Sequence, residues 1–466
     1  MLKLAVKNPY DLSFLGELPF SSPEQVEAAL GRAEALYRNR DAWLSIEQRS
    51  SVLRNLGRLI EERRDVIAMQ ASCEGGKPLT DSLVEVQRAQ VGVTTACEAI
   101  ARLLGQEVPM GLGASSANRW AVTFREPRGV VFAISAFNHP FNLLIHQVIT
   151  AIAAGCPVLI KPASETPLSC QTLLELLAEA GLPEGYCQMI VTDNELTQKV
   201  VSDERVAFLS FIGSSEVGWM LRSRLAPGAA CVLEHGGVAP VIVDETADLA
   251  DALPLITKGA FYHAGQVCVS VQRLFVHESI LSYVTEQLSA LASNLVVGDP
   301  CDPATEVGPL IRPSEVARVD GWVQEAVHDG AQLALGGKRR GPTLYEPTIL
   351  VNPHAASRIS RSEVFGPVLA VYSYRELDEA VSRANLKDSY FQAGFFTNRL
   401  DRALYVGRTL QGTAVMINDH SAFRVDWMPF GGHRKSGLHM GGIEPTMRDM
   451  TIERMLVFRQ PPSARL

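Results

Sequence analysis

The stretch GVVFAISAFNHPFNLLIHQVITAIAAGCPVLIKPASETP, residues 129–167, decides the fold of this chain. Its β-branched apolar run over Val130–Ala136 predicts a strand, the helical segment Phe141–Ala154 follows, and Val158–Lys161 predicts a second strand. Two strands joined by one helix form a βαβ unit, whose strands lie parallel in one sheet. We therefore expect an α/β protein with a Rossmann-like open parallel sheet.

The same alternation of strands and helices continues as far as Gly236. An open parallel sheet binds its ligands at the carboxyl ends of the strands. We therefore expect binding residues in three loops at that edge, residues 137–140, 162–167 and 213–218. Further strands are predicted at Gln188–Thr192, Val206–Ile212 and Cys231–Leu233, and further helices at Ser169–Ala180, Leu196–Ser202 and Glu216–Leu225.

The remaining sequence predicts a second α/β region and two flanking segments. Helical spacing over Pro23–Leu104 predicts about three amphipathic helices ahead of the first sheet. The alternating pattern of Thr446–Arg459 predicts a strand that pairs either with the strand at Arg119–Arg128 or with another subunit. The second α/β region runs from about Val238 to Phe430, with strands at Val241–Val243, Arg273–His277, Pro367–Tyr372 and Ala414–Ile417.

The composition is that of a folded globular protein. The 466 residues are 47% hydrophobic and 20% charged, and the net charge of -8 without basic clusters argues against nucleic-acid binding. The sequence contains neither a signal peptide nor 18 uninterrupted apolar residues, so we expect a cytoplasmic protein without a membrane partner. The eight cysteines are scattered without a zinc-binding spacing, which predicts reduced thiols and no metal.

One cysteine stands out in the segment FYHAGQVCVSVQR, residues 261–273. Cys268 is flanked by two valines, with His263 and Gly265 upstream, so the sulfur is expected at the junction of a loop and a regular element. A thiol at such a junction is either a nucleophile or one more small buried apolar side chain.

Four polar positions fall at the predicted strand ends. The loop FIGSSEVG, residues 211–218, opens a helix whose N-terminal N–H groups suit a pyrophosphate, although such loops are commonplace. Lys161 delivers a cation to the same edge, where a lysine is often simply solvated. Glu234 is a candidate general base or the cap of a turn, and Asn138 is a candidate oxyanion donor or a helix N-cap.

Taken together, these motifs resemble the aldehyde dehydrogenase superfamily. The resemblance covers residues 20–460 and rests on FNHPFN, KPASETP, FIGSSEVG, LEHGG, GQVC, EVFGPV and PFGGHRKSG in that order. It implies an NAD(P)-binding domain of residues 1–108 and 129–236, a catalytic domain of residues 237–434, and a small β oligomerisation element of residues 109–128 and 445–466. It also implies a homodimer or homotetramer that acts on a small-molecule aldehyde.

The resemblance implies a covalent mechanism with three catalytic residues. Cys268 is similar to the nucleophile that forms a thiohemiacetal and then, after hydride loss to the nicotinamide, a thioester. The Asn138 amide and the Cys268 backbone N–H correspond to the donors that hold the oxyanion. Glu234 corresponds to the base that activates water to release the acid.

The cofactor contacts carried over by the resemblance come from both α/β regions. Glu363 resembles the residue at the nicotinamide ribose, with Phe365 beside it, and Lys161 resembles the lysine at the adenosine ribose. Ser214 resembles the pyrophosphate contact, in one loop with Gly213 and Val217. Ser164 stands where NAD-preferring members carry a glutamate, with Glu165 one position late. Losing that carboxylate makes room for a 2′-phosphate, so the cofactor is NADP or NAD, and the sequence favours NADP.

Four further residues are expected at the substrate, namely His139, Val267, Arg424 and Phe430. His139 and Arg424 replace residues that are often aromatic in the family, which suggests a short polar or anionic aldehyde. In an alternative interpretation Arg424 pairs with Asp426 and never meets the substrate. Val267 stands where some phosphonoacetaldehyde-specific relatives carry arginine, which argues against that one substrate.

Two other functions stay open at this point. A CoA-acylating relative would pass the acyl group to coenzyme A, but such relatives usually lack the glutamate that this chain has at Glu234. A catalytically inactive binding or structural protein on the same scaffold would have no use for the three reactive positions.

Overall fold

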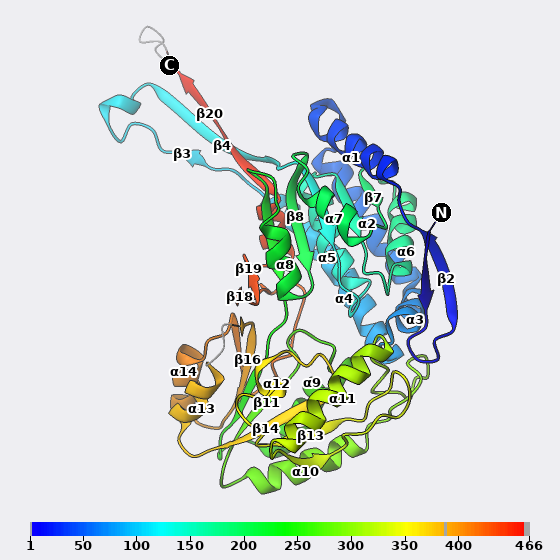
Figure 1. Cartoon of the computed structure of the whole chain (residues 1–466). Coiled ribbons are helices and arrows are strands. Elements are labelled where there is room, and N and C mark those ends of the chain that lie inside the picture. Colours follow the sequence, from blue (N-terminus) through cyan, green and yellow to red (C-terminus); the bar gives the residue numbers. More distant parts are fainter. Residues whose placement is uncertain (1, 386–388, 461–466) are drawn as a thin grey trace.

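The computed structural model describes residues 2–385 and 389–460. In Figure 1 the chain forms two α/β lobes and a narrow arm that projects from the upper lobe. The six-stranded sheet of the first lobe has the strand order β19-β9-β8-β5-β6-β7. Its strands β5 (Val130–Ile134), β6 (Val158–Lys161), β7 (Cys187–Met189), β8 (Val206–Ile212) and β9 (Ala230–Glu234) are parallel, and β19 (Gly437–Leu438) pairs antiparallel with β9.

The central βαβ unit forms where the sequence predicts it. Every residue of helix α5 (Asn142–Ala154) is buried between the sheet and the N-terminal helices, which explains why its sequence is apolar all round. Strand β7 ends at Met189, three residues before the predicted Thr192. After β7 the chain turns toward the N-terminal segment, where the Ser21 backbone N–H donates to the Val191 carbonyl oxygen at 2.8 Å.

The N-terminal segment differs from the prediction in two respects. A hairpin of β1 (Lys3–Lys7) and β2 (Phe14–Pro19), which the sequence analysis did not identify, precedes the helices. Residues 23–99 form four α-helices rather than about three, because the chain breaks at Arg63 and again at Gly76, whose φ of 73° ends a helix. The helices of this lobe are α1 (Pro23–Arg38), α2 (Ile46–Glu62), α3 (Arg64–Gly75), α4 (Leu79–Ala99), α6 (Leu168–Glu179), α7 (Asn194–Val201) and α8 (Ser215–Arg222).

The second lobe contains a seven-stranded sheet in the described chain, with the order β12-β13-β14-β11-β10-β16-β17. The predicted strands occur as β10 (Pro240–Val243), β11 (Arg273–His277), β14 (Val368–Tyr374) and β17 (Ala414–Ile417), while β12 (Gln332–Leu335), β13 (Thr348–Val351) and β16 (Gln392–Phe396) were not predicted. All neighbours are parallel except β12 and β13. The helices are α9 (Leu249–Phe261), α10 (Leu281–Ser293), α11 (Pro313–His328), α12 (Arg358–Arg361), α13 (Leu377–Ala384) and α14 (Leu400–Thr409).

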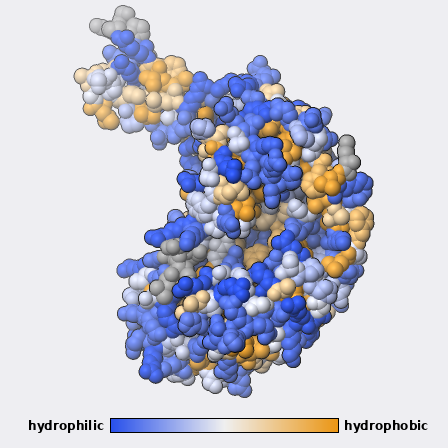
Figure 2. Space-filling model, viewed as in Figure 1, coloured by the Kyte–Doolittle hydropathy of each residue, from blue (hydrophilic) through white to orange (hydrophobic). Residues whose placement is uncertain are grey.

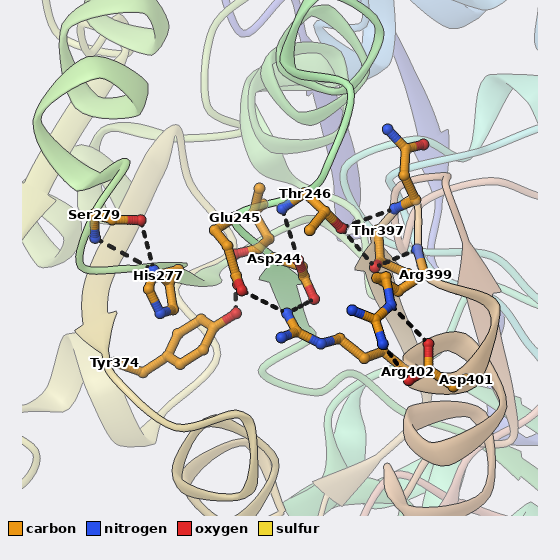
Figure 3. Close-up of polar contacts among 12 residues, drawn as sticks. Asp244, Glu245, Thr246, His277, Ser279, Tyr374, Thr397, Arg399, Asp401 and Arg402 are labelled. Carbon is orange, nitrogen blue, oxygen red and sulfur yellow. Dashed lines mark hydrogen bonds and ion pairs between the residues drawn. The ribbon is translucent and has the colours of Figure 1, made fainter.

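Ion pairs close the carboxyl edge of this second sheet. Directly after β10, the buried Asp244 carboxylate accepts a hydrogen bond from Arg402 of α14 at 2.5 Å, and Arg402 also lies 2.8 Å from Glu245 (Figure 3). The Tyr374 hydroxyl donates to the Val243 carbonyl at 3.1 Å in the same cluster. Open space in this lobe therefore lies at the opposite, amino edge of the sheet.

The arm consists of three antiparallel strands. Strand β20 (Thr451–Arg459) pairs with β4 (Arg119–Pro127) of the same chain, and β4 pairs with β3 (Glu107–Val108). The predicted strand at Thr446–Arg459 therefore starts later, because its first residues belong to helix α15 (Ile443–Asp449). Residues 461–466 of the predicted oligomerisation element lie outside the described residues. Within the described chain, no helix combines the length and the apolarity needed to cross a bilayer.

Candidate active site

A cavity of about 440 Å³ lies between the carboxyl edge of the first sheet and the amino edge of the second. The surface is visibly hollowed between the two lobes (Figure 2). The loops after β5 and β8 line this cavity together with the end of β9, and they face the turn before β11 and the segment before β14. All predicted site residues except Lys161 and Ser164 line it, namely Asn138, His139, Gly213, Ser214, Val217, Glu234, Val267, Cys268, Glu363, Phe365, Arg424 and Phe430.

Cys268 lies in a tight turn between a 3-10 helix (Tyr262–Gly265) and β11, at the junction of loop and regular element that its sequence predicts. The backbone before it is left-handed at three successive residues, His263, Ala264 and Gly265. Only glycine fits at position 265, because a Cβ there would lie 2.2 Å from the Gly366 carbonyl oxygen. This constrained turn holds the sulfur against the cavity.

Burial raises the pKa of the Cys268 thiol to about 12. The nearby carboxylates of Glu363 and Glu234 raise this pKa as well, whereas the Arg424 guanidinium lowers it. The sulfur is therefore a neutral thiol at neutral pH. Any added positive charge in the cavity favours the nucleophilic thiolate.

Asn138 is buried in the loop ahead of α5, with its amide directed toward the Cys268 segment. Its Nδ2 donates to the Gln266 carbonyl oxygen at 2.9 Å, which leaves its second N–H for another acceptor. The N-cap interpretation of Asn138 is wrong, because α5 begins at Asn142 and its cap residue is Phe141. The backbone N–H groups of Phe141 and Asn142 both donate to the Glu85 carboxylate, each at 2.9 Å.

Glu234 ends β9 and presents its carboxyl group to the cavity. Burial raises the pKa of this carboxyl, while the Arg424 charge lowers it. A Cβ on Gly441 would lie 2.2 Å from Glu234 Oε1, so glycine is needed there to leave room for the carboxylate. Among the described residues no group donates a hydrogen bond to the Glu234 side chain, which does not support the alternative role of a turn cap.

The residues predicted at the nicotinamide form an enclosed polar pocket. The buried Oε1 atom of Glu363 has no hydrogen-bond partner in the described chain. Burial raises the pKa of this carboxyl to about 8. A Cβ on Gly236 would lie 1.8 Å from the same oxygen, so the backbone approaches Glu363 as only glycine allows. An unpaired buried acceptor fits a ribose hydroxyl donor, as NAD(P) would bring.

The residues predicted at the pyrophosphate stand at the start of α8. Ser214 is the N-cap residue of this helix, and its side chain makes no capping hydrogen bond. The first N–H groups of α8 therefore receive no hydrogen-bond acceptor from the Ser214 side chain, and Gly213, Ser214 and Val217 line the cavity beside them. This arrangement fits an anionic group of the cofactor.

Lys161 and Ser164 do not line the cavity, although Ala163 between them does. Lys161 ends β6, where burial lowers the pKa of its ammonium group, and it donates to the Pro162 carbonyl at 3.4 Å. Ser164 is exposed, and Glu165 is paired with Arg312 at 2.9 Å. Lys161 and Ser164 therefore flank the cavity-lining Ala163 without lining the cavity themselves.

Arg424 contributes a buried cation to the cavity of Cys268. Its guanidinium lies over the Phe430 ring at 3.6 Å from the centroid, and its Nε has no hydrogen-bond partner in the described chain. The alternative pairing with Asp426 is not formed, since Asp426 binds Arg88 at 2.9 and 3.0 Å and His146 at 2.8 Å. Burial opposes ionisation of Asp426, but the His146 hydrogen bond and the two arginine charges hold its pKa below the usual range.

The sequence analysis missed several cavity residues, among them Arg88, Asn142 and Tyr262. The Tyr262 hydroxyl lies 2.5 Å from His139 Nε2, and burial holds the pKa of His139 well below its usual value. Arg88 reaches the site from α4, far from every motif, so no local pattern marks it. Tyr262 is close to Cys268 in the sequence, and this proximity was the signal that could have marked it as a cavity residue.

Comparison with known proteins agrees with this geometry. Residues 2–455 match the family model described as the aldehyde dehydrogenase family. The chain is 39% identical to the 3-sulfolactaldehyde dehydrogenase of Priestia aryabhattai over 456 residues, which is 98% of this chain and 94% of the relative.

Two solved structures share both fold and sequence. Aldehyde dehydrogenase 21 from Physcomitrella patens, in complex with its product succinate, superposes with a TM-score of 0.95 at 34% identity, covering 99% of this chain and 96% of that one. The NADP complex of glyceraldehyde-3-phosphate dehydrogenase GapN from Methanocaldococcus jannaschii gives a TM-score of 0.92 at 34% identity, covering 98% and 99%. The chain therefore belongs to the aldehyde dehydrogenase family.

Proposed function

We propose that this enzyme oxidises a short anionic aldehyde to its carboxylic acid with NADP+ or NAD+ as the hydride acceptor. The observation that carries the choice of substrate is the Arg424 guanidinium, which is buried in the cavity of Cys268 with its Nε unpaired. Burial disfavours this charge, and although the carboxylates of Glu234 and Asp426 offset part of the cost, an anionic substrate that pairs with the guanidinium would offset more of it.

The mechanism begins when the Cys268 thiol gives up its proton to water and the resulting thiolate adds to the aldehyde carbon. The oxygen of that carbon becomes an oxyanion, which the free Asn138 N–H and the Cys268 backbone N–H are placed to hold. A bound nicotinamide supplies the acceptor for the hydride that leaves this carbon. What remains on Cys268 is a thioester.

Glu234 is proposed to release the acid. Its carboxyl group faces the same cavity, and burial raises its pKa toward the range in which a carboxylate can accept a proton from water. Water activated in this way attacks the thioester carbon, and the Cys268 sulfur leaves. The presence of Glu234 favours hydrolysis over transfer to coenzyme A, and equal NAD(P)H formation with and without coenzyme A would support that choice.

Two relatives give chemical support for an anionic substrate. A 3-sulfolactaldehyde dehydrogenase acts on an aldehyde that carries a sulfonate, and the plant structure contains succinate, a dicarboxylate product. Sulfonate and carboxylate both accept charge-assisted hydrogen bonds from a guanidinium. The neighbouring His139 and Tyr262 hydroxyl would add polar contacts to a short substrate.

For the cofactor we propose a preference for NADP. Ser164 is small and uncharged, and Glu165 is held by Arg312 rather than free to repel a phosphate. GapN, which was solved with NADP, is a similar structure. A ratio of kcat/KM for NADP over NAD below one would contradict the preference.

We further propose that the arm makes a homodimer or homotetramer, with residues 109–128 and 445–460 as the described part of the oligomerisation element. Strand β20 exposes Met455, Leu456, Val457 and Phe458, and Trp120 of β4 stacks on Phe458. Figure 2 shows hydrophobic surface on the projecting arm. So many apolar side chains on a projecting edge are unfavourable in water unless another chain covers them. The residues 1–108 with 129–236 and the residues 237–434 are proposed as the cofactor and catalytic domains.

The test of the substrate uses Arg424→Leu with two aldehydes of matched size, succinate semialdehyde and butanal. The KM for succinate semialdehyde is expected to rise about 10- to 100-fold, the cost of losing hydrogen bonds to a charged group, while the KM for butanal stays unchanged. Arg424→Lys, which keeps the charge, serves as the control and recovers part of the loss. An equal effect of Arg424→Leu on both aldehydes would contradict the proposal.

A further inference from the structure

Two cysteines outside the active site lie sulfur to sulfur. Cys73 Sγ is 3.0 Å from Cys301 Sγ, although 228 positions separate them. Cys73 belongs to the last turn of α3 in the first lobe, and Cys301 lies in the segment between α10 and α11 of the second lobe. All eight cysteines are free and described, and no other two sulfurs are in hydrogen-bond contact. The contact therefore joins the two lobes.

Backbone contacts on both sides of the pair hold the two segments together. The Leu79 backbone N–H donates across the two segments to the Pro300 carbonyl at 2.8 Å, and within its own segment the Cys301 N–H donates to Asp299 Oδ1 at 2.9 Å. A Cβ on Gly308 would lie 2.1 Å from the Gly76 carbonyl oxygen, so the backbones of the two segments are in direct contact there. A disulfide needs its sulfurs about 2 Å apart, which small side-chain rotations at this site would achieve.

The two thiols differ in reactivity. The hydrogen bond from Cys301 lowers the pKa of Cys73 to about 7, even though burial and the charges of Asp299 and Asp11 raise it. The same contact, with burial, raises the pKa of Cys301. At neutral pH a substantial share of Cys73 is therefore thiolate while Cys301 is the thiol, the complementary pair that oxidation to a disulfide requires. Both sulfurs are half-buried, so a small oxidant can reach them.

We propose that Cys73 and Cys301 form an oxidative modification site at which a hydroperoxide converts the two thiols into a reversible disulfide between the lobes. The Cys73 thiolate attacks one peroxide oxygen, the O–O bond breaks, and a sulfenic acid and hydroxide form. The Cys301 sulfur then attacks the sulfenic sulfur, its proton leaves with the hydroxyl group as water, and the S–S bond forms. In sum the two thiols lose two hydrogens and hydrogen peroxide becomes two waters.

The bond would clamp the lobes close to the catalytic loops. Pro309, in the same segment as Cys301, accepts a hydrogen bond from Gln266 Nε2 at 3.2 Å, and the Gln266 carbonyl accepts the Asn138 amide. The catalytic thiol itself is a poorer target, because burial raises the pKa of Cys268 to about 12. An oxidant is therefore consumed at the Cys73 pair before it reaches Cys268.

The test exposes the intact enzyme to a few equivalents of hydrogen peroxide at neutral pH, alkylates the remaining thiols in denaturant, and maps peptides without reduction. The expected product is one pair of peptides joined through Cys73 and Cys301, which dithiothreitol separates. Cys268 and the half-buried Cys97 are expected to remain thiols during oxidation and therefore to be found alkylated. Two outcomes would overturn the proposal. One is oxidation of Cys268 while Cys73 and Cys301 are recovered as alkylated thiols, and the other is a disulfide between two different protein chains.

Single variants test the order of the steps. Cys301→Ser removes the second thiol, so Cys73 is expected to stop at the sulfenic acid and to be trapped by dimedone, whereas Cys73→Ser leaves Cys301 unmodified. Cys97→Ser, a matched half-buried control, still forms the bond. Oxidation should raise the Tm of the wild-type enzyme by several degrees and leave that of Cys301→Ser unchanged. Dimedone labelling of Cys301 in Cys73→Ser, or an equal Tm shift in Cys301→Ser, would refute the mechanism.

Discussion

Arg88 and Asp426 are joined by two parallel hydrogen bonds, Nε to Oδ2 at 2.9 Å and Nη2 to Oδ1 at 3.0 Å, across 338 positions of sequence. Asp426 also binds His146 and Asn142, at 2.8 and 3.2 Å. These contacts use the hydrogen-bonding capacity of the Asp426 carboxylate. Arg424, two residues away in sequence, is thereby left available to the cavity.

Replacing Arg88 should therefore impair recognition of an anionic substrate without direct contact. In Arg88→Leu the buried Asp426 carboxylate loses its main partner and attracts Arg424, so the KM for an anionic aldehyde rises while that for a neutral aldehyde does not. Breaking a buried pair should also lower the free energy of unfolding by about 3 kcal/mol. Steady-state kinetics and urea denaturation measure the two effects, and Arg88→Lys is the control that keeps the charge. An unchanged KM for the anionic aldehyde would contradict this role.

Glu234→Gln should separate the two halves of the reaction. The amide cannot accept a proton from water, so thioester hydrolysis slows by about 10²- to 10⁴-fold while thioester formation continues. Rapid mixing with excess aldehyde should then give one equivalent of NAD(P)H per site followed by a stall. Absence of this burst would assign Glu234 to the first half of the reaction instead.

Asn138→Asp tests the oxyanion donor with little change in shape. A carboxylate cannot donate to the oxyanion, so kcat should fall by about 10²- to 10³-fold, as for other single donors of this kind. Asn138→Gln keeps the amide but displaces it, so its kcat should lie between those of the wild type and Asn138→Asp. A Tm close to that of the wild type, measured in parallel, is required to attribute the loss to chemistry.

The pH profile should reflect the protonated state of Cys268. Burial and the Glu363 charge raise the pKa of this thiol to about 12, so the free enzyme holds the neutral thiol at neutral pH and gains thiolate as the pH rises. The rate of alkylation of Cys268 by iodoacetamide should accordingly increase with pH, by nearly tenfold per unit well below the pKa. Arg424→Leu removes the charge that lowers this pKa, so its profile should move to higher pH. A shift to lower pH would contradict the assignment.

A buried ion pair supports the loop of Asn138 from behind. Lys77 and Glu85 are both fully buried and lie 2.5 Å apart, and Glu85 in turn accepts the N–H groups of Phe141 and Asn142. Lys77→Met leaves the carboxylate without its counter-ion and should cost about 3–5 kcal/mol of unfolding free energy. Arg58→Met, which breaks an exposed pair with Glu62 on α2, should cost less than about 1 kcal/mol in the same urea titration. Equal costs would show that burial of Lys77 is unimportant.

Local sequence patterns were sufficient for the βαβ core and for the loops at its carboxyl edge. Strand β8 has its predicted bounds, and Cys268, Glu234 and Asn138 line one cavity as the ordered motifs suggest. The N-cap alternative for Asn138 failed because the carboxylate that binds the start of α5 comes from Glu85, on a distant helix. Residues such as Glu85 and Arg88 act through tertiary contacts, so nothing in their own neighbourhood marks them.

Short strands between loops were the hardest elements to predict. Strands β12, β13 and β16 each have four or five residues, and such runs also suit buried loops or helix fragments. The same ambiguity hid the hairpin of β1 and β2. Lys161 and Ser164 lie outside the cavity because of the path that the loop after β6 takes. No residue pattern in that loop predicts this path.

The pairing of Thr451 with Pro127 at the base of the arm has a consequence for synthesis of the protein. A ribosome releases β4 long before β20 has been translated, so the nascent chain exposes an unsatisfied edge of β4 until residues 451–459 emerge. Completion of the arm is thus a late event in biogenesis. Termination of translation between residues 128 and 450 would leave exposed the edge of β4 that pairs with β20.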